Sequence, residues 1–562
     1  MPYSQNNSSD SKALNERHLS VTKTVLHLRQ LFQNVAKGLA KSCSENGRLG
    51  DSLLDAQQLN CYELAFAASE LRAAEQSLLI TGKDGSDVNK ELALVFAADV
   101  LPVTVGRLEK ISASLKITDD LANLRQTFEY KEMVSASLPI RLASVGAEVF
   151  TLGNSFHQIE TNEDVDIARE VFKRFAEDVV SPFAEDIHRY DMDIPEDLLS
   201  HMKEMGVFGL SIPEKFGGSA PNDGEDNLTM IAITEALSEV SLGAAGSLIT
   251  RPEILTRAIL AGGTEAQKSK WLPKIAVGDP LCAIAITEPD YGSDAANLKL
   301  KAVKVDGGWT LNGAKTWCTF AGRAGVLMVV ARTGPEKGFK GLSVFLVDKP
   351  KYDGHSFEYS QEGGGRLSGK AISTIGYRGM HSYDLSFDEV FVPDENVLGE
   401  EAGLGRGFYY TMSGMTGGRI QTSARACGVM IAALKSSIQY AVDRKIFGIP
   451  LAEHQLTQTK IATMTARFMA ARHLTYKVGE LLNTGTGQME ASLAKLFACR
   501  SAELITRDAL QIHGGMGYAE ECPVSRYFVD ARVLSIFEGA EEVLALRVIA
   551  RGILRNELKA IE

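Results

Sequence analysis

The chain has 562 residues, 45% of them hydrophobic and 23% charged, and its formal net charge at pH 7 is −12. This length exceeds a single hydrophobic core, so about two to four domains are expected. The composition is that of a soluble globular protein. The acidic total, without a long basic run, argues against a broad nucleic-acid or anionic-membrane surface.

The sequence carries no sign of a secreted or membrane-spanning protein. No apolar segment reaches the ~20 residues that a bilayer-spanning helix needs, and residues 1–12 lack the apolar core of a signal peptide. The seven cysteines are scattered and form no CxxC pair, which is usual for reduced thiols. We therefore expect a cytoplasmic protein.

The first part of the chain, residues 1–150, predicts a helical extension without catalytic motifs. Residues 1–12 are rich in Ser, Asn and Asp and are expected to be disordered. Apolar stripes at helical spacing follow over residues 64–79 and 92–100. A turn is predicted between them, at residues 82–86.

This extension contains an echo of the C-terminal region. Residues 92–97 (LALVFA) parallel residues 493–498 (LAKLFA) at an offset of 401, and residues 78–82 parallel residues 481–485 at an offset of 403. The two-residue difference fits inside the predicted turn. Two alternatives stay open: a degenerate duplication, or the general likeness of amphipathic helix pairs.

The periodicity then changes from helix to strand and back. Alternating residues on both sides of a turn at 306–308 are typical of a β-hairpin, and the apolar runs at 326–331 and 342–347 fit buried strands. No GxGxxG follows a strand, so no Rossmann nucleotide site is expected. The chain divides into a helical block at 151–280, a β domain at 281–402 and a helical domain at 403–562.

Near the C-terminus, Glu538 lies between two apolar residues and Gly539, ahead of a helical pattern that starts at about Val543. The helix N-terminus would favour the ionised carboxylate, and burial would favour the neutral acid. A carboxylate under both influences can act as a general base near neutral pH. The alternative is a cap or a solvated first-turn charge, which is the more common role of an acid there.

Five motifs occur together and in one order. They are ITEPDYGSD at 286–294, LNGAKTWCT at 311–319, DRKIFG at 443–448, QIHGGMGY at 511–518 and FEG at 537–539. With these motifs, residues 160–562 resemble the acyl-CoA dehydrogenase family of flavoproteins. The resemblance implies an α+β multidomain fold with a helical domain, a middle β domain and a C-terminal helical bundle, here preceded by the extra helical extension.

The family's reaction removes a proton α to a thioester and a hydride from the β carbon. The resemblance makes Glu538 the catalytic base. Because such a proton is weakly acidic, the developing enolate must be stabilised, and in the family the N–H of the base residue and a flavin ribityl hydroxyl do this. Some relatives carry the base just before an arginine on an earlier helix. That position is Gly418 here, ahead of Arg419, so the alternative base is absent.

The resemblance also implies FAD as cofactor. Thr287 matches the residue that binds the pyrimidine end of the flavin, Thr319 the donor to N5, and Trp317 the ring that flanks the isoalloxazine. Arg444 and Gln511 match residues that reach the FAD of a neighbouring subunit. The further cofactor-binding candidates are Ile286, Phe447, Gln455, Gly514 and Gly515. The chain departs from the family pattern at Ala540, Glu542 and Ile446, which puts FAD contacts at those points in doubt.

For the substrate, Ser293 matches a contact to the CoA chain, and Gly539 lies beside the base. Residues 247–257 match the region that closes the acyl pocket. Arginines there are unusual for a hydrocarbon pocket, because a buried guanidinium needs an anionic partner. A distal carboxylate on the substrate would supply one. The candidates for binding it are Arg251, Arg257, Arg378 and Arg419. The alternative for Arg251 and Arg257 is that they face solvent or pair with Glu253 or Glu265.

These features most resemble the branch of the family that oxidises a branched dicarboxylic thioester, methylsuccinyl-CoA. The implied partners are the CoA thioester, electron-transfer flavoprotein as electron acceptor, and a second copy of the chain in a homodimer; no metal, nucleic acid or membrane is expected. Three alternatives stay open: a short- or branched-chain fatty acyl-CoA dehydrogenase, a glutaryl-CoA dehydrogenase, and a weakly catalytic DNA-associated homologue, which would need a basic face.

Overall fold

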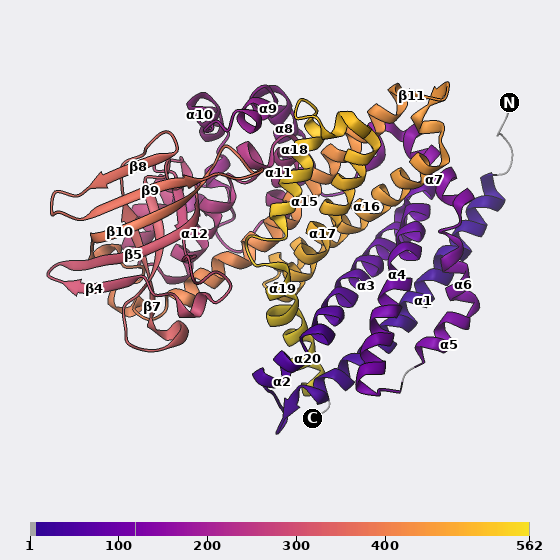
Figure 1. Ribbon diagram of the computed structural model, residues 1–562, viewed down its shortest axis with the longest axis horizontal. Helices are drawn as coiled ribbons and strands as arrows, with labels where there is room; N and C mark the ends of the chain where they lie inside the picture. Colours follow the sequence, from indigo (N-terminus) through magenta and orange to yellow (C-terminus); the bar gives the residue numbers. More distant parts are fainter. Residues whose placement is uncertain (1–6, 119, 561–562) are drawn as a thin grey trace. The chain divides into compact units, whose positions relative to one another are not determined.

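The protein is described by a computed structural model that covers residues 7–118 and 120–560. The chain forms two compact units. Unit 1 consists of Met1–Thr161, Val429–Leu481 and Gly487–Glu562, and unit 2 of Asn162–Gly428 and Leu482–Thr486. Figure 1 labels the elements of both. Helical blocks flank a strand-rich block in the sequence, which is the α+β class that the sequence predicts.

In its described residues, unit 1 has helices and two short hairpins, β1 (Ser44–Glu45) with β2 (Arg48–Leu49) and β11 (Lys445–Ile446) with β12 (Ile449–Pro450). Its N-terminal helices are α1 (Asn7–Ser42), α2 (Asp51–Ala56), α3 (Gln58–Asp84), α4 (Asp87–Leu115), α5 (Leu121–Gln126), α6 (Phe128–Ser135) and α7 (Pro139–Leu152). Its C-terminal elements are the second half of α15 (Gly407–Asp443), α16 (Gln455–Asn483), α17 (Gln488–His513), α18 (Pro523–Leu534), α19 (Glu541–Val543), the π-helix η11 (Leu544–Ala550) and α20 (Arg551–Lys559).

Helix α1 begins earlier than the sequence predicts. Residues 7–12 belong to it, so the expected disorder is wrong for these residues, and residues 1–6 lie outside the described part of the chain. Leu14, Val21 and Leu28 are buried along one stripe of α1, which packs against α3 and α4. A helix fixed in this way extends readily, because each added residue gains a backbone hydrogen bond without a new nucleation step.

The turn between α3 and α4 is shorter than the predicted 82–86. Helix α3 continues through Gly82 to Asp84, and Ser86 caps α4 by accepting a hydrogen bond from the backbone N–H of Asn89 at 3.3 Å. Gly82 is needed inside the helix because a Cβ there would lie 2.9 Å from Cε1 of the His18 ring. The glycine therefore marks a close helix contact, whereas the sequence suggested a turn.

The N-terminal helices pack along the C-terminal helices of the same unit, with α3 and α4 beside α16 and α17 (Figure 1). Asp99 on α4 forms an ion pair with Arg467 on α16. On α7, Gly146 approaches α16 so closely that a Cβ would lie 2.1 Å from the carbonyl oxygen of Gln458. The extension thus covers one side of the C-terminal bundle.

The two members of the sequence echo meet in this contact. Phe96 on α4 and Phe497 on α17 occupy equivalent positions at the offset of 401, and their ring centroids are 5.5 Å apart at an interplanar angle of 72°. Contact between equivalent positions is what a two-fold arrangement of two copies produces. The contact is compatible with duplication, which stays a prediction.

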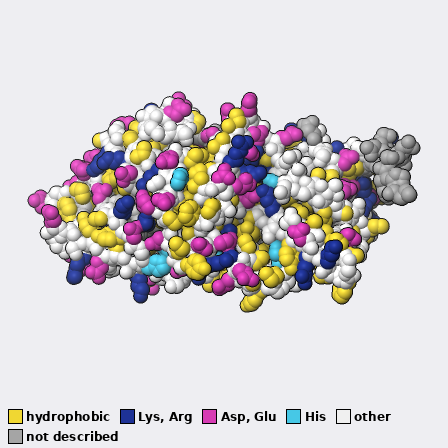
Figure 2. Space-filling view, turned by 90° about the horizontal axis from the view of Figure 1, so that it is seen from above, with side chains coloured by type: hydrophobic (Ala, Val, Ile, Leu, Met, Phe, Trp, Pro, Cys, Tyr) yellow, Lys and Arg dark blue, Asp and Glu magenta, His cyan; other side chains and the backbone are white. Residues whose placement is uncertain are grey.

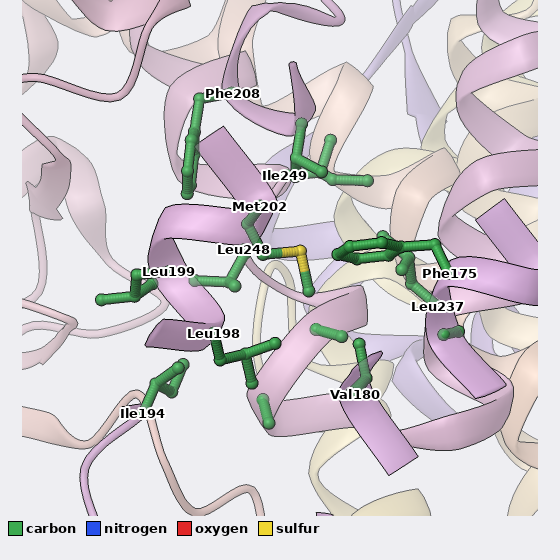
Figure 3. Close-up of a cluster of buried hydrophobic side chains, with 14 of the residues drawn as sticks. Phe175, Val180, Ile194, Leu198, Leu199, Met202, Phe208, Leu237, Leu248 and Ile249 are labelled. Carbon is green, nitrogen blue, oxygen red and sulfur yellow. The ribbon is translucent and has the colours of Figure 1, made fainter. Parts of the chain in front are cut away.

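The first helices of unit 2, within residues 163–246, form one buried cluster around α11. Phe175 from α8, Met202 from α10 and Leu237 from α11 meet there (Figure 3). The helices of this cluster are α8 (Glu163–Phe175), the π-helix η2 (Ala176–Val180), α9 (Ser181–Arg189), α10 (Glu196–Glu204), α11 (Asn227–Val240) and the π-helix η5 (Leu242–Gly246). Unit 2 also contains α12 (Thr250–Gly262) and α13 (Glu265–Ala276), with α14 (Glu400–Gly403) and the first half of α15 later in the chain.

Unit 2 also holds an eight-stranded sheet in the order β3-β6-β4-β5-β10-β9-β8, with β7 paired to β6. The predicted hairpin is confirmed, since β4 and β5 pair antiparallel around residues 306–307. Leu327 and Phe345 pack with Leu385 of β10 in one cluster, while Met328 packs with residues of α12 and α13 in another. Burial on both faces explains the continuous apolar runs of β6 and β7. The strands are β3 (Cys282–Ala285), β4 (Lys301–Val305), β5 (Gly308–Thr319), β6 (Val326–Arg332), β7 (Leu342–Asp348), β8 (Ser356–Ser360), β9 (Arg366–Ile372) and β10 (Ser382–Pro393).

Among the described residues, no single helix is both long and apolar enough to cross a bilayer, and only the bent pair Phe128–Ser135 and Pro139–His157 meets the length and composition together.

On the face shown in Figure 2, acidic and basic side chains are interspersed. All seven cysteines are free thiols.

A histidine ties the loop after α9 to the start of β10. The His381 ring lies between two carboxylates, with Nε2 3.2 Å from Asp191 and Nδ1 3.0 Å from Asp193. Ligand atoms of Asp191, His355 and His381 lie within 4.8 Å of one another, as in a metal site. Because Asp191 also pairs with Arg378, we assign the group to holding this loop.

This contact predicts a pH dependence of stability. Burial alone would lower the pKa of His381, but the carboxylates of Asp193 and Asp191 outweigh it and raise the pKa above the ordinary 6.5. The stabilisation is therefore fully present below about pH 6.5 and is lost as the pH rises through the folded-state pKa. The urea concentration at the unfolding midpoint of the wild type should fall as the pH is raised from about 6 to about 9. In His381→Gln it should fall less over the same range. An equal fall in both proteins would contradict this.

Candidate active site

Glu538 lies in a tight turn between α18 and α19, as the sequence predicts. The φ angles are 53° at Glu538 and 104° at Gly539, and the left-handed conformation of a non-glycine residue costs about 1–3 kcal/mol. A buried lysine stabilises this turn: Nζ of Lys495 donates to the carbonyl oxygens of Phe537 at 2.7 Å and Gly539 at 2.6 Å. One ammonium group thus bridges the two carbonyls that flank the candidate base.

In unit 2, a β-bulge separates the environments of Trp317 and Thr319. Strand β5 places two residues, Thr316 and Trp317, opposite the single residue Asp384 of β10, which is the two-against-one count of a bulge. Trp317 has a φ of 57° and is 56% exposed. Thr319 is buried, with Oγ1 3.0 Å from Oγ of Ser382. In a regular strand these two side chains would share one face.

The backbone at Ile286 and Thr287 is fixed against the same strand. Nζ of Lys315 donates to the carbonyl oxygen of Ile286 at 2.7 Å and pairs with Glu288 at 2.8 Å. The backbone N–H of Thr316 donates to the carbonyl oxygen of Thr287 at 2.9 Å. Burial lowers the pKa of Lys315, and the carboxylate of Glu288 opposes that shift. The pair therefore joins the two flavin motifs of unit 2.

Glu288→Ala is expected to destabilise the protein by about 3–5 kcal/mol, because it leaves the ammonium of Lys315 buried without its carboxylate. The free energy of unfolding in urea is the measurement. Glu362→Ala removes an exposed acid in a turn of the β domain and serves as the control, with little change expected. Equal stability of the two variants would contradict the assignment.

Arg257 and Arg378, two of the candidate substrate arginines, contact other protein groups at short distances. Nε of Arg257 is 3.0 Å from Glu253, and its Nη1 pairs with Glu225. Nη1 of Arg378 donates to the carbonyl oxygen of His188 at 2.6 Å. For Arg257 the structure therefore gives the alternative that the sequence left open, pairing with Glu253.

Arg251, Arg419 and Ser293 also lie in unit 2, whereas Gly539 lies beside Glu538 in unit 1. Arg251 is in the first turn of α12 and only 7% exposed. Arg419 is on α15, and burial lowers the pKa of its guanidinium. Ser293 is exposed in the loop after β3. Two cationic side chains are thus placed where burial strengthens their interaction with an anion.

The cofactor-binding candidates of unit 1 lie on its surface, among them Arg444 and Gln511, which are expected to reach the FAD of a neighbouring subunit. Phe447, at the tip of the β11–β12 hairpin, is 96% exposed. The others that are exposed are Arg444, Gln455, Gln511, Gly514 and Gly515. Such exposure is what a contact with a second chain requires.

Comparison with known proteins finds similarity over most of the chain. Residues 162–279, 283–390 and 405–554 match the N-terminal, middle and C-terminal domains of acyl-CoA dehydrogenase. A (2S)-methylsuccinyl-CoA dehydrogenase of Cereibacter sphaeroides is 36% identical over 540 residues, which is 93% of this chain and 96% of that protein. The chain belongs to the acyl-CoA dehydrogenase family.

Solved structures of similar chains give the same result. Butyryl-CoA dehydrogenase from Megasphaera elsdenii has a TM-score of 0.63 at 32% identity and covers 70% of this chain and 98% of its own. A chain in the structure of the electron transferring flavoprotein of Acidaminococcus fermentans has a TM-score of 0.62 at 31% identity, covering 69% and 97%. This acyl-CoA dehydrogenase is therefore a flavin-dependent oxidoreductase acting on the CH–CH bond of acyl-CoA, with FAD as cofactor.

The residues present fit a flavin. Thr319 offers a hydroxyl, which can donate as well as accept, at a strand end fixed by Ser382. Trp317 exposes an aromatic ring that can lie against an isoalloxazine, and the exposed Arg444 suits a pyrophosphate. Thr287, Trp317 and Thr319 would hold the flavin ring.

Sequence reasoning did not assign roles to Lys495 and Glu288. The signal for Lys495 is a lysine inside an otherwise apolar helix stripe; the equivalent position in the echo is Leu94, which has no catalytic turn to hold. Glu288 lies inside the ITEPDYGSD motif at 286–294, but its partner Lys315 is 27 residues away in the sequence. Pairings of this kind follow from the fold and have no local pattern.

Proposed function

We propose that this chain oxidises (2S)-methylsuccinyl-CoA to mesaconyl-CoA, a step of the ethylmalonyl-CoA pathway of acetate assimilation. One observation carries the proposal. The match to the methylsuccinyl-CoA dehydrogenase spans 93% of the chain and so includes most of the N-terminal extension, whereas the butyryl-CoA dehydrogenase structure covers 70%. The buried arginine in the pocket segment, Arg251, adds chemical support for a dicarboxylic substrate.

Glu538 takes the α proton of the thioester. Its backbone N–H donates to the thioester oxygen, on which negative charge develops as the proton leaves. Lys495 keeps this N–H and carboxylate in place by fixing the carbonyls on both sides. Bound FAD supplies the acceptor for the β hydride. Thr319 and Thr287 orient that acceptor, and Ser293 binds the CoA chain.

The distal carboxylate of the substrate is bound by Arg251, with Arg419 as the second candidate. A guanidinium binds a carboxylate through two parallel hydrogen bonds, which orients the branched acyl chain as well as attracting it. Arg257 and Arg378 hold protein elements in place, through Glu253 and His188 respectively. The substrate's charge thus distinguishes it from fatty acyl thioesters.

A substrate panel tests this function. Purified enzyme is given methylsuccinyl-CoA, glutaryl-CoA and butyryl-CoA with an artificial electron acceptor, and products are identified by mass. Mesaconyl-CoA formation at the highest kcat/KM is expected. Carbon dioxide release from glutaryl-CoA, or preference for butyryl-CoA, would instead assign the chain to one of the alternative activities.

We propose electron-transfer flavoprotein as the physiological oxidant, because a flavin reduced by two electrons can pass them on one at a time to the flavin of a partner. The similarity to a chain from the Acidaminococcus fermentans structure supports this partner. Reoxidation of the substrate-reduced enzyme by electron-transfer flavoprotein, faster than by dioxygen, is the expected result; reoxidation by dioxygen alone would exclude it.

We further propose that the chain is a homodimer. Tetrameric members of the family associate through helical-domain surfaces, and here the extension covers the α16–α17 side of the C-terminal bundle in the same chain. The exposed hairpin at Phe447 remains for one partner. Light scattering should give twice the chain mass of 60.9 kDa, and a tetramer mass would contradict the proposal.

A further inference from the structure

The N-terminal extension touches the turn that carries Glu538. The phenolic O–H of Tyr62 on α3 donates to Oε1 of Glu541 at 2.6 Å. Glu541 is the first residue of α19, three residues after Glu538, and its side chain is 11% exposed. A hydrogen bond to a charged acceptor is stronger than a neutral one, and this one is largely shielded from water.

The Tyr62 side chain is prearranged for this contact. Its ring lies 4.8 Å from that of Phe66, and the guanidinium of Arg500 lies over Phe66 at 5.8 Å. Nη2 of Arg500 is also 3.7 Å from Glu541. Burial raises the pKa of the Tyr62 phenol and the carboxylate of Glu541 raises it further, so the phenol stays protonated and remains a donor.

The turn is therefore fixed on two sides. Lys495 binds the carbonyls that flank Glu538, and Tyr62 binds the residue that starts the following helix. The backbone N–H of Glu541 closes the turn by donating to the carbonyl oxygen of Ser535 at 3.1 Å. A left-handed conformation such as that of Glu538 persists only where its surroundings over-determine it.

We propose that the N-terminal extension takes part in catalysis by positioning the base: Tyr62, acting through Glu541, holds the Glu538 turn in its working geometry. The proposal rests on the assignment of Glu538 as the base. It gives the extension a second role besides covering the bundle. Butyryl-CoA dehydrogenase of Megasphaera elsdenii, matched over 98% of its own length by 70% of this chain, has no counterpart to most of this extension.

The test compares variants that break the hydrogen bond with one that keeps an acceptor. Tyr62→Phe and Glu541→Leu remove it, and Glu541→Gln retains a carbonyl oxygen. Because small misplacements of a catalytic group have large effects, we expect roughly a tenfold fall of kcat in the first two with KM unchanged. The double variant should lose no more than the larger single loss, and Glu541→Gln should keep most of the rate.

A readout independent of turnover is amide hydrogen exchange over residues 536–544, which should quicken in Tyr62→Phe and Glu541→Leu. The matched control is Tyr130→Phe, whose hydroxyl contacts Arg125 at 2.9 Å elsewhere in the extension; its kcat and its exchange at 536–544 should equal the wild type's. Wild-type kcat and exchange in both bond-breaking variants would overturn the positioning role.

Two variants distinguish a wrong base assignment from a wrong positioning role. Turnover retained in Glu538→Gln would remove the base assignment and the positioning role with it. An inactive Glu538→Gln beside a fully active Tyr62→Phe would remove the positioning role alone. Equal losses in Tyr62→Phe and Tyr130→Phe would show a general loosening of the extension and would also overturn the proposal.

Discussion

Glu538→Gln is expected to keep its flavin and lose the reaction. The amide has nearly the same shape as the carboxylate, so the turn held by Lys495 and the backbone N–H of residue 538 stay as they are. It cannot accept the α proton, and removal of a general base lowers the rate by about 10²–10⁴-fold. Stopped-flow measurement of flavin reduction by substrate gives the rate directly, and the absorbance of the purified variant gives its flavin content.

Glu542→Gln is the matched control for this substitution. Glu542 is an exposed acid in the same short segment, and glutamine is the residue that often stands there in the family. Its flavin should be reduced at the wild-type rate. Reduction at the wild-type rate in Glu538→Gln would mean that another group removes the proton.

Arg251→Met is expected to change which substrate the enzyme prefers. Methionine cannot bind the distal carboxylate of the substrate, so this carboxylate stays buried and unpaired. The loss of binding free energy is about 3–5 kcal/mol. Since 1.36 kcal/mol is a factor of ten, kcat/KM for methylsuccinyl-CoA should fall by about 10²–10⁴-fold. Butyryl-CoA has no carboxylate, so its kcat/KM should stay level or rise.

The control is Arg257→Met, which removes a guanidinium from the same helix but one held by Glu253 and Glu225. Its effect should appear as lower stability, because Glu253 is fully buried, and should change both substrates alike. A selective loss for the dicarboxylic substrate in Arg257→Met, with none in Arg251→Met, would exchange the roles of the two arginines. The kcat/KM values of Arg419→Met for the same two substrates show whether Arg419 also binds the distal carboxylate.

The sequence predicts well what local periodicity and turn chemistry determine. The hairpin at residues 306–307 and the buried strands β6 and β7 follow from alternation and apolar runs. The turn before α19 follows from Gly539 and the helical pattern after it. The family is predicted from the sequence because five motifs from separate parts of the chain occur together and in one order.

Other features depend on residues that only the fold brings together. Tyr62 and Glu541 are 479 positions apart, and neither has a neighbour in sequence that marks the contact. Alternation predicts that Trp317 and Thr319 share a face; the bulge opposite Asp384 separates them. Tertiary packing likewise extends α1 over residues that their polar composition assigns to disorder.

The most direct measurement is an anaerobic titration of the purified yellow enzyme with CoA esters, followed by flavin absorbance. We expect rapid and complete bleaching with (2S)-methylsuccinyl-CoA and little with succinyl-CoA. An absorbance that stays unchanged with (2S)-methylsuccinyl-CoA while butyryl-CoA bleaches it would contradict the proposed substrate, and a purified protein without a flavin spectrum would contradict the account as a whole.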